Sequence, residues 1–229
     1  MLTMASYAID PALLEPYLPA YTELDLWQGR CYVSLVGFLF ADTRLKGLSV
    51  PFHKTFEEVN LRFYVRRRTA DGGWRRGVVF ISEIVPKPAL AFVANLVYKE
   101  HYRRMPMKHS WHTTGETMTI QYEWNNGGWN SLCVVADITA VPISEGSEEA
   151  FITEHYYGYS RADARSTTEY RVDHPTWMVY PIQGYEIKAD FGGLYGPSFA
   201  FLEGRTPDSI LLAEGSPVTV GSKQVIRNP

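Results

Sequence analysis

The most regular alternation of hydrophobic and polar positions lies between residues 57 and 67. Hydrophobic side chains alternate there with polar ones: Val59, Leu61, Phe63 and Val65 against Glu58, Asn60, Arg62 and Tyr64. A period of two puts the two sets on opposite faces of one strand. Turn residues follow at 70–73 and an apolar run at 77–82, so this region predicts a β-hairpin.

Other segments predict further strands and a few short helices. The run 31–40 is apolar on both alternations, which indicates a central strand covered on two faces. Residues 118–124 and 129–140 flank the turn sequence 125–128 and predict a second hairpin. Additional strands are expected within 170–179, 184–191 and 208–220, short helices after Asp10 and within 148–156, and a helix or helix-to-strand passage at 89–98.

Composition favours one β-rich domain. The 229 residues are 45% hydrophobic and 21% charged, which suits one sizeable core and is short for two full domains. The 18 Gly and 14 Pro fall in short clusters, as expected for many strands joined by turns. We therefore predict a single domain spanning 1–229.

Charge and cysteine content exclude several kinds of partner. A net charge of −3 gives no field that would collect nucleic acid or an anionic membrane surface. Cys31 and Cys133 each lie in an apolar run and are expected to be buried free thiols in a reducing compartment. With no long apolar segment and no basic leader, the sequence predicts a cytoplasmic protein that binds neither nucleic acid nor membrane.

The order of several short motifs resembles a known family. These motifs are Asp10-Pro11, Leu18-Pro19, Tyr32–Val36, Val50–Phe52, Glu58–Val65, Gly77–Phe80, Phe151–Tyr156 and Asp173–Trp177. Together they resemble the YqjF-like family of uncharacterised proteins, whose fold is similar to that of acetoacetate decarboxylase. The resemblance implies a β-rich α+β fold, with an antiparallel sheet curled into a cone or barrel around a pocket and a few short helices.

The same resemblance argues against the decarboxylase reaction. That enzyme uses the second lysine of a Pro-Lys-Lys motif to form a Schiff base, and laying 94–103 on this motif puts His101 at the proline and Tyr102-Arg103 at the lysine pair. An arginine stays protonated and cannot act as an amine nucleophile. Lys99 is the nearest alternative nucleophile, although the adjacent Glu100 would raise its pKa if the two side chains meet.

The polar face of the strand at 57–67 is the first candidate site. Within the expected pocket, Arg62 would bind a carboxylate, Glu58 would act as acid or base, and Asn60 and Tyr64 would orient the ligand. The alternative is that these four residues form the solvated face of an antiparallel sheet.

The charged cluster at 98–104 is the second candidate. It is interpreted either as an exposed edge with internal ion pairs or as the rim of the pocket, with His101 as a proton-transfer group. We predict Glu58 and His101 as an acid–base pair. The predicted ligand-binding residues are Asn60, Arg62, Tyr64, Tyr98, Lys99, Tyr102 and Arg103.

The sequence predicts no metal and no cofactor. His109 and His112 would meet only on a helix, and neither a zinc-protease pattern nor paired cysteines occur. The glycines at 192–196 have the wrong spacing for a dinucleotide fingerprint. Six arginines crowd the first hairpin with only Asp71 opposing them, and they are interpreted as a solvated hairpin tip: Arg62, Arg66, Arg67, Arg68, Arg75 and Arg76.

Three possible functions remain open at this stage. The first is a protein that binds a small carboxylate or carbonyl compound, or an enzyme that acts on one, without the Schiff-base lysine pair. The second is a non-catalytic protein-interaction module with an aromatic, arginine-rich surface. Decarboxylase or aldol-type chemistry through Lys99 is a third, and whether the chain forms a homo-oligomer stays open.

Overall fold

The structure is a computed structural model that describes residues 1–45, 48–49, 55–87 and 101–227. Most of the described chain is β-strand. The strands are β1 (Leu2–Ile9), β2 (Glu23–Leu24), β3 (Cys31–Phe40), β4 (Arg44–Leu45), β5 (Leu48–Ser49), β6 (Phe56–Arg68), β7 (Trp74–Val85), β8 (Tyr102–Arg104), β9 (Met107–Thr114), β10 (Thr117–Asn125), β11 (Trp129–Asp137), β12 (Val141–Pro142), β13 (Tyr157–Asp163), β14 (Ser166–Asp173), β15 (Met178–Tyr180), β16 (Ile182–Lys188), β17 (Ser209–Ala213), β18 (Thr219–Val220) and β19 (Gln224–Arg227).

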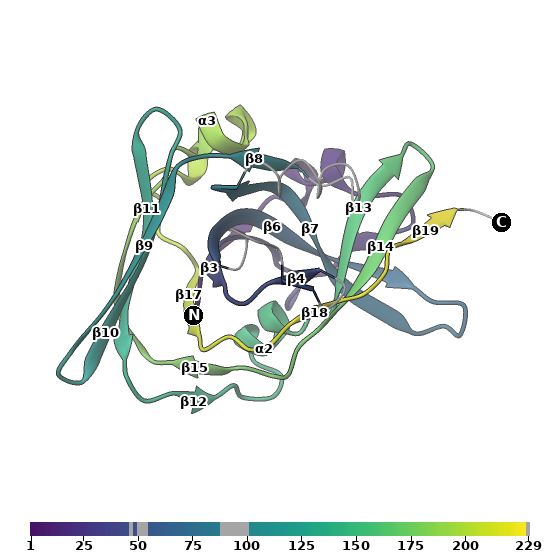
Figure 1. Ribbon diagram of the computed structural model, residues 1–229. Helices are drawn as coiled ribbons and strands as arrows, with labels where there is room; N and C mark the ends of the chain where they lie inside the picture. The colour runs from purple at the N-terminus through teal and green to yellow at the C-terminus, as the bar shows by residue number, and fades with distance from the viewer. Residues whose placement is uncertain (46–47, 50–54, 88–100, 228–229) are drawn as a thin grey trace.

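The strands form one large sheet and one smaller sheet. The large sheet runs in the order β12-β15-β17-β1-β3-β6-β7-β13-β14-β18, and β2, β8 and β19 pair with its members. The smaller sheet has the order β16-β11-β10-β9, while β4 and β5 pair with each other. Figure 1 shows the large sheet curving around α2, with the smaller sheet standing along one side.

Strand β6 lies at the centre of the molecule and is covered on both faces. Its residues Val59, Leu61 and Phe63 belong to the main hydrophobic cluster, which also contains Tyr122 and Trp124 of the smaller sheet. The opposite face of β6 looks toward a second cluster, which includes Tyr64 of β6 itself and contains Phe151 and Ile152 of α2, Trp177 and Leu211. The polar residues of β6 therefore project into the concave side of the large sheet.

The helices are short, and the cap predicted at Asp10 is present. They are the 3₁₀-helices at Pro11–Leu13, Glu15–Tyr17 and Pro197–Leu202 and the α-helices α2 (Glu148–Thr153) and α3 (Phe191–Tyr195). Asp10 accepts a hydrogen bond from the Ala12 backbone N–H, and Ser147 accepts one from that of Ala150. No helix among the described residues is long and apolar enough to cross a membrane.

Both predicted hairpins and the central strand are confirmed. They correspond to β6–β7, β10–β11 and β3, and β3 pairs with both β1 and β6. The expected helix at 148–156 ends at Thr153, and the expected strand at 184–191 ends at Lys188, before α3 begins. Both cysteines are free, with Cys31 buried and Cys133 half-buried. The expected helical passage at 89–98 lies outside the described residues.

Two predictions about the sheet are wrong. The large sheet is mixed rather than antiparallel, since β13 and β8 each pair with β7 in parallel. The described strands also do not close into a barrel, because the sheet ends at β12 and β18. Both end strands are two residues long, and Pro142 of β12 has no N–H to donate, so these edges offer few hydrogen bonds for closure.

Gly77 allows the parallel approach of β13 to β7. A Cβ atom at this position would lie 2.5 Å from the Tyr157 carbonyl oxygen and 2.6 Å from the Tyr159 ring. Neither neighbour is the free end of a flexible chain, so the strands would have to separate. This contact holds β13 and the preceding segment, which carries His155, against β7.

We expect Gly77→Ala to lower the free energy of unfolding by about 1–3 kcal/mol, because it overpacks a closed strand interface. Urea denaturation monitored by circular dichroism measures the effect. Gly184→Ala is the matched control, since Gly184 also lies in a strand but its Cβ would meet nothing within 4 Å. Equal effects of the two substitutions would contradict this account of Gly77.

Candidate functional site

The four polar residues of β6 share the inner face of the large sheet. Glu58, Asn60 and Tyr64 are at most 2% exposed, and Arg62 is half-buried. The other face of β6 is buried against the smaller sheet, so Arg62 is the one of these four residues that keeps part of its exposure to water. The interpretation of these residues as a solvated face is therefore wrong.

Glu58 is held by two side chains from different strands. The Asn60 amide Nδ2 donates to Glu58 Oε1 at 3.0 Å, and the Tyr102 hydroxyl donates to Glu58 Oε2 at 3.3 Å. Tyr102 reaches this position because β8 runs parallel to β7 and places it opposite Glu83. A side-chain hydrogen bond also links Tyr102 to Glu83, which is itself 2% exposed and lies opposite Asn60.

The burial of Glu58 sets its protonation behaviour. Desolvation raises the pKa of Glu58 to about 7, although hydrogen bonds from Asn60 and Tyr102 and the charge of Arg62 act in the opposite direction. Burial and the nearby carboxyls of Glu58 and Glu83 raise the pKa of Tyr102 well above 10, so its hydroxyl stays a neutral donor. A carboxyl group that titrates near neutral pH is suited to proton transfer.

Arg62 is a cation without an anionic partner among the described residues. Its Nη2 donates to the Met4 sulfur at 3.7 Å, and its Cζ lies 5.9 Å from the centre of the Tyr64 ring. Its Nε is buried and has no hydrogen-bond partner within the described chain, and no described carboxylate forms an ion pair with it. The charge of Arg62 lowers the pKa of both His155 and His174, which places two imidazoles near it.

Tyr64 continues the polar face with a row of hydroxyl groups. Its hydroxyl is 2.7 Å from the Ser34 hydroxyl, which is 2.8 Å from that of Ser6. These three residues come from neighbouring strands β6, β3 and β1. The Tyr64 ring packs against Phe151 of α2 and against the His155 ring, with centroids 5.6 and 4.7 Å apart.

A buried ion-paired group borders this row. Asp25 Oδ2 lies 2.6 Å from Arg76 Nε and 3.1 Å from His155 Nε2. Burial alone would raise the pKa of Asp25, but these hydrogen bonds lower it below its usual value. Burial lowers the pKa of His155 to about 4. The hydrogen bond and charge of Asp25 act to raise this pKa, whereas the charges of Arg76 and Arg62 lower it further.

The structure separates the other predicted site residues. His101 is exposed, and its backbone carbonyl accepts from the Glu83 N–H, whereas the side chains that bond Glu58 are Asn60 and Tyr102. Arg103 points away from Tyr102, and its Nη1 donates to the Leu194 carbonyl of α3 at 2.6 Å. The pairing of Glu58 with His101 stays a prediction. Tyr98 and Lys99 lie outside the described residues.

Sequence reasoning missed three members of this site. Glu83 follows directly after the predicted apolar run 77–82, and the β-bulge between Leu61 and Arg62 shifts the register that brings it opposite Asn60. Asp25 and His155 are 130 residues apart. A lone carboxylate inside the apolar run 77–85 was the one local signal, since charged residues are rarely buried unless they are paired.

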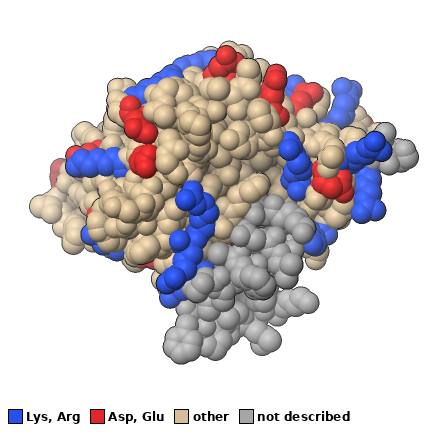
Figure 2. Space-filling model, turned by 90° about the horizontal axis from the view of Figure 1, so that it is seen from above, with Lys and Arg blue, Asp and Glu red and all other residues tan. Residues whose placement is uncertain are grey.

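Four arginines of the hairpin are ion-paired with distant carboxylates. Arg67 and Arg75 both bind Glu169 at 2.7 and 2.6 Å, and Arg66 binds Glu23 at 2.7 Å. On the face shown in Figure 2, Lys and Arg side chains are scattered in several separate groups, and Asp and Glu side chains lie beside some of them. Because of these ion pairs, the positive charge of the hairpin arginines does not depend on Asp71 for neutralisation.

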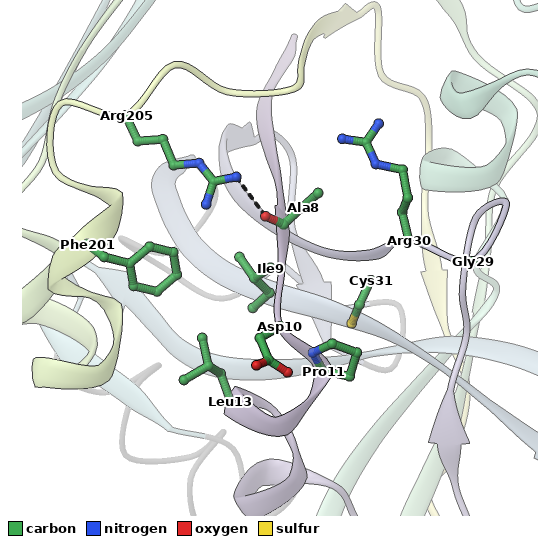
Figure 3. A pocket seen from close by; sticks show the side chains of 10 residues that line it. All are labelled: Ala8, Ile9, Asp10, Pro11, Leu13, Gly29, Arg30, Cys31, Phe201 and Arg205. Atoms are coloured by element: carbon green, nitrogen blue, oxygen red, sulfur yellow. Dashed lines mark hydrogen bonds between the residues drawn. The ribbon is translucent and has the colours of Figure 1, made fainter.

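An open groove of about 380 Å³ lies elsewhere on the molecule. In Figure 3, Arg30 and Arg205 approach it from opposite sides, with Phe201 below Arg205 and Cys31 below Arg30, and Arg205 donates to the Ala8 carbonyl. Both arginines form ion pairs with Asp208, and burial raises the pKa of the Cys31 thiol to about 11. The groove therefore offers neither a free cation nor a reactive thiolate.

Comparison with known proteins shows the family. The DUF2071 family model, described as an uncharacterised conserved protein, matches residues 1–217. The chain belongs to the DUF2071 family. It is also 32% identical over 69 residues to the uncharacterised protein YqjF of Bacillus subtilis, a match that covers 30% of this chain and 28% of YqjF.

Solved structures support the fold expected from the resemblance. Acetoacetate decarboxylase from Legionella pneumophila is 13% identical with a TM-score of 0.59, and the match covers 98% of this chain and 84% of that one. The enduracididine biosynthesis enzyme MppR complexed with pyruvate is also 13% identical with a TM-score of 0.59, with 98% and 82% coverage. The DUF2071 chain thus has an acetoacetate decarboxylase-like fold.

The raised pKa of Glu58 predicts a specific effect of pH on stability. The unfolded carboxyl loses its proton near pH 4.5 and the folded one near 7, so this group favours folding below pH 4.5 and loses that contribution as the pH rises to 7. Glutamine does not titrate, so the Glu58→Gln variant should not lose this stability as the pH rises. Its free energy of unfolding relative to that of the wild type should therefore increase by about 3 kcal/mol between pH 4.5 and 7. Urea denaturation at several pH values tests it, and a constant difference between the proteins would contradict it.

His155 should affect the pH dependence of stability in the opposite direction to Glu58. Its folded pKa of about 4 lies below the ordinary value of 6.5, so the neutral imidazole supports folding above pH 6.5 and the wild type loses stability as the pH falls toward 4. His155→Gln should weaken this dependence in the same denaturation series. An unchanged slope between pH 6.5 and 4 would show that His155 is not buried in its neutral form.

Proposed function

We propose that this protein binds a small organic carboxylate on the inner face of the large sheet, with Arg62 as its charged anchor. One observation carries the proposal: Arg62 has no ion-pair partner among the described residues, and its Nε is buried without a hydrogen bond there. A guanidinium remains charged at any physiological pH and is costly to desolvate without an anion. A ligand carboxylate would supply that anion in a bidentate geometry.

The contrast with the neighbouring arginines supports this interpretation. Arg66, Arg67, Arg75 and Arg76 lie on the same hairpin and each has a carboxylate of the chain itself within 2.7 Å. Arg62 instead has the sulfur of Met4 as its hydrogen-bond acceptor. The chain therefore neutralises these four arginines with its own carboxylates and leaves Arg62 for another group.

Glu58 would act on the bound molecule as an acid or base. Its pKa of about 7 means that both protonation states are populated near neutral pH. Asn60 Oδ1 is buried without a partner in the described chain, so it is available as a further acceptor. MppR, which has a similar fold, was solved in complex with pyruvate, and this supports a small organic carboxylate as the ligand class.

The interaction-module alternative has less support. It relied on the arginines of the hairpin tip, and most of these pair with carboxylates of the same chain. Trp74 remains 41% exposed, but the guanidinium carbons of Arg66 and Arg68 lie 4.3 and 5.5 Å from its ring. The inner-face proposal is therefore the one we develop.

Thermal-shift and calorimetric titration with pyruvate, acetoacetate and their amides test the proposal. We expect at least one acid to raise the Tm, its uncharged amide to have little effect, and Arg62→Gln to weaken binding of the acid at least about tenfold. Glu58→Gln should retain binding of the carboxylate, because the anchor is Arg62.

Arg66→Gln is the matched control, because it removes a guanidinium from the same strand but one already paired with Glu23. It should leave the titrations unchanged. If folded Arg62→Gln binds the acids as well as wild type does, or if the wild type discriminates no acid from its amide, the proposed anchor is wrong.

A further inference from the structure

The imidazole of His155 has one satisfied and one unsatisfied nitrogen. Its side chain is 1% exposed. Nε2 lies 3.1 Å from Asp25 Oδ2, whereas Nδ1 is buried and has no hydrogen-bond partner among the described residues. Buried polar atoms in folded proteins are nearly always paired, so the Nδ1 atom requires an explanation.

Asp25 determines which nitrogen carries the proton. The Asp25 carboxylate also accepts a hydrogen bond from Arg76 Nε at 2.6 Å, which keeps it ionised. An ionised carboxylate only accepts hydrogen bonds, so Nε2 of His155 must be the protonated nitrogen. Since the imidazole is neutral near pH 7, Nδ1 then presents a lone pair.

The position of His155 connects this lone pair with the proposed site. The His155 ring lies 4.7 Å from the Tyr64 ring, and the Arg62 guanidinium carbon lies 5.9 Å from the same Tyr64 ring. Arg62 and His155 therefore flank one aromatic side chain on the inner face of the sheet. The charge of Arg62 also acts on the imidazole directly.

We propose that Nδ1 of His155 accepts a hydrogen bond from a hydroxyl group of the ligand whose carboxylate Arg62 binds, so that the site selects hydroxy acids over the corresponding oxo acids. This inference rests on the proposed function and specifies its substrate class. A hydroxyl group can donate to a neutral imidazole, whereas a ketone has only acceptor atoms and would leave Nδ1 unpaired. Sites built to bond a hydroxyl reject analogues that lack it for this reason.

Asp25 and Arg76 have positioning roles in this arrangement. They do not reach the ligand, but they fix the tautomer and orientation of the imidazole. If the proton moved to Nδ1, that atom would become a donor, and the preference would shift toward the ketone. The selectivity thus depends on a carboxylate on the far side of the ring.

Matched pairs of acids test the inference: lactate against pyruvate, 3-hydroxybutyrate against acetoacetate, and 4-hydroxypentanoate against levulinate. The three pairs vary the separation between the carboxylate and the oxygen while preserving the carbon chain. In isothermal titration calorimetry, we expect the hydroxy acid of at least one pair to bind wild-type protein about threefold to tenfold more tightly than its oxo acid.

His155→Phe should abolish this difference and preserve binding of the oxo acid, because it removes the acceptor and retains a planar ring. His112→Phe is the control, since it removes an exposed imidazole on β9, and it should keep the preference of the wild type. A preference that survives in folded His155→Phe overturns the proposal, and so does equal affinity within every pair.

A nuclear magnetic resonance measurement on wild-type protein avoids any effect of substitution on folding. With ¹⁵N-labelled histidine, free His155 should show an unprotonated Nδ1 and a protonated Nε2. Saturation with the preferred hydroxy acid should move the Nδ1 resonance, and the paired oxo acid should move it less. An Nδ1 resonance that is protonated in the free protein, or that no bound hydroxy acid shifts, rejects the proposal.

The outcomes separate this inference from the proposed function. If no acid binds, or binding does not depend on Arg62, the anchor itself is wrong. If acids bind through Arg62 but hydroxy and oxo acids behave alike, the anchor stands and the role of His155 is rejected.

Discussion

The burial of β6 on both faces is the constraint on which the rest of the structure depends. Its hydrophobic alternation packs against the smaller sheet, and its polar alternation faces the concavity of the large sheet. A polar group that loses water must find another partner or shift its pKa. Each polar residue of the strand shows one of these responses: Tyr64 bonds Ser34, Asn60 bonds Glu58, and Glu58 titrates near pH 7. Arg62 cannot respond by titration, because a guanidinium does not lose its charge, and its Nη2 donates to the sulfur of Met4 rather than to a carboxylate.

Local patterns predicted the elements near this strand and did not predict how distant elements assemble. The alternation at 57–67 and the turn residues after it were enough for the β6–β7 hairpin, because a hairpin is specified by adjacent residues. Parallel pairing of β13 with β7 joins Tyr157 to Gly77 across 80 positions, and no short-range periodicity encodes that choice. The glycine that permits it is visible in the sequence, but its partner is not.

The same limit applies to the site. The sequence predicted that Glu58, Asn60, Arg62 and Tyr64 share a face, and left open which face it would be. It also suggested that the hairpin arginines lack counterions, because only Asp71 is near them in the chain. Glu169 pairs with Arg67 across 102 positions and with Arg75 across 94. Once these remote carboxylates are in place, Arg62 and the exposed Arg68 are the two of these six arginines without an ion pair among the described residues.

Tyr102 shows how a conserved fold can hold different chemistry. The resemblance to acetoacetate decarboxylase put Tyr102 and Arg103 where that enzyme has its lysine pair. In the structure the Tyr102 hydroxyl donates to Glu58, while Arg103 turns to α3. A phenol whose pKa lies well above 10 cannot attack a carbonyl at neutral pH, but it can hold a carboxyl group in place and influence when that group releases its proton. Chemistry at these described residues would therefore proceed by proton transfer at Glu58, with the charge of the ligand balanced by Arg62, rather than by a covalent intermediate on the Tyr102 side chain.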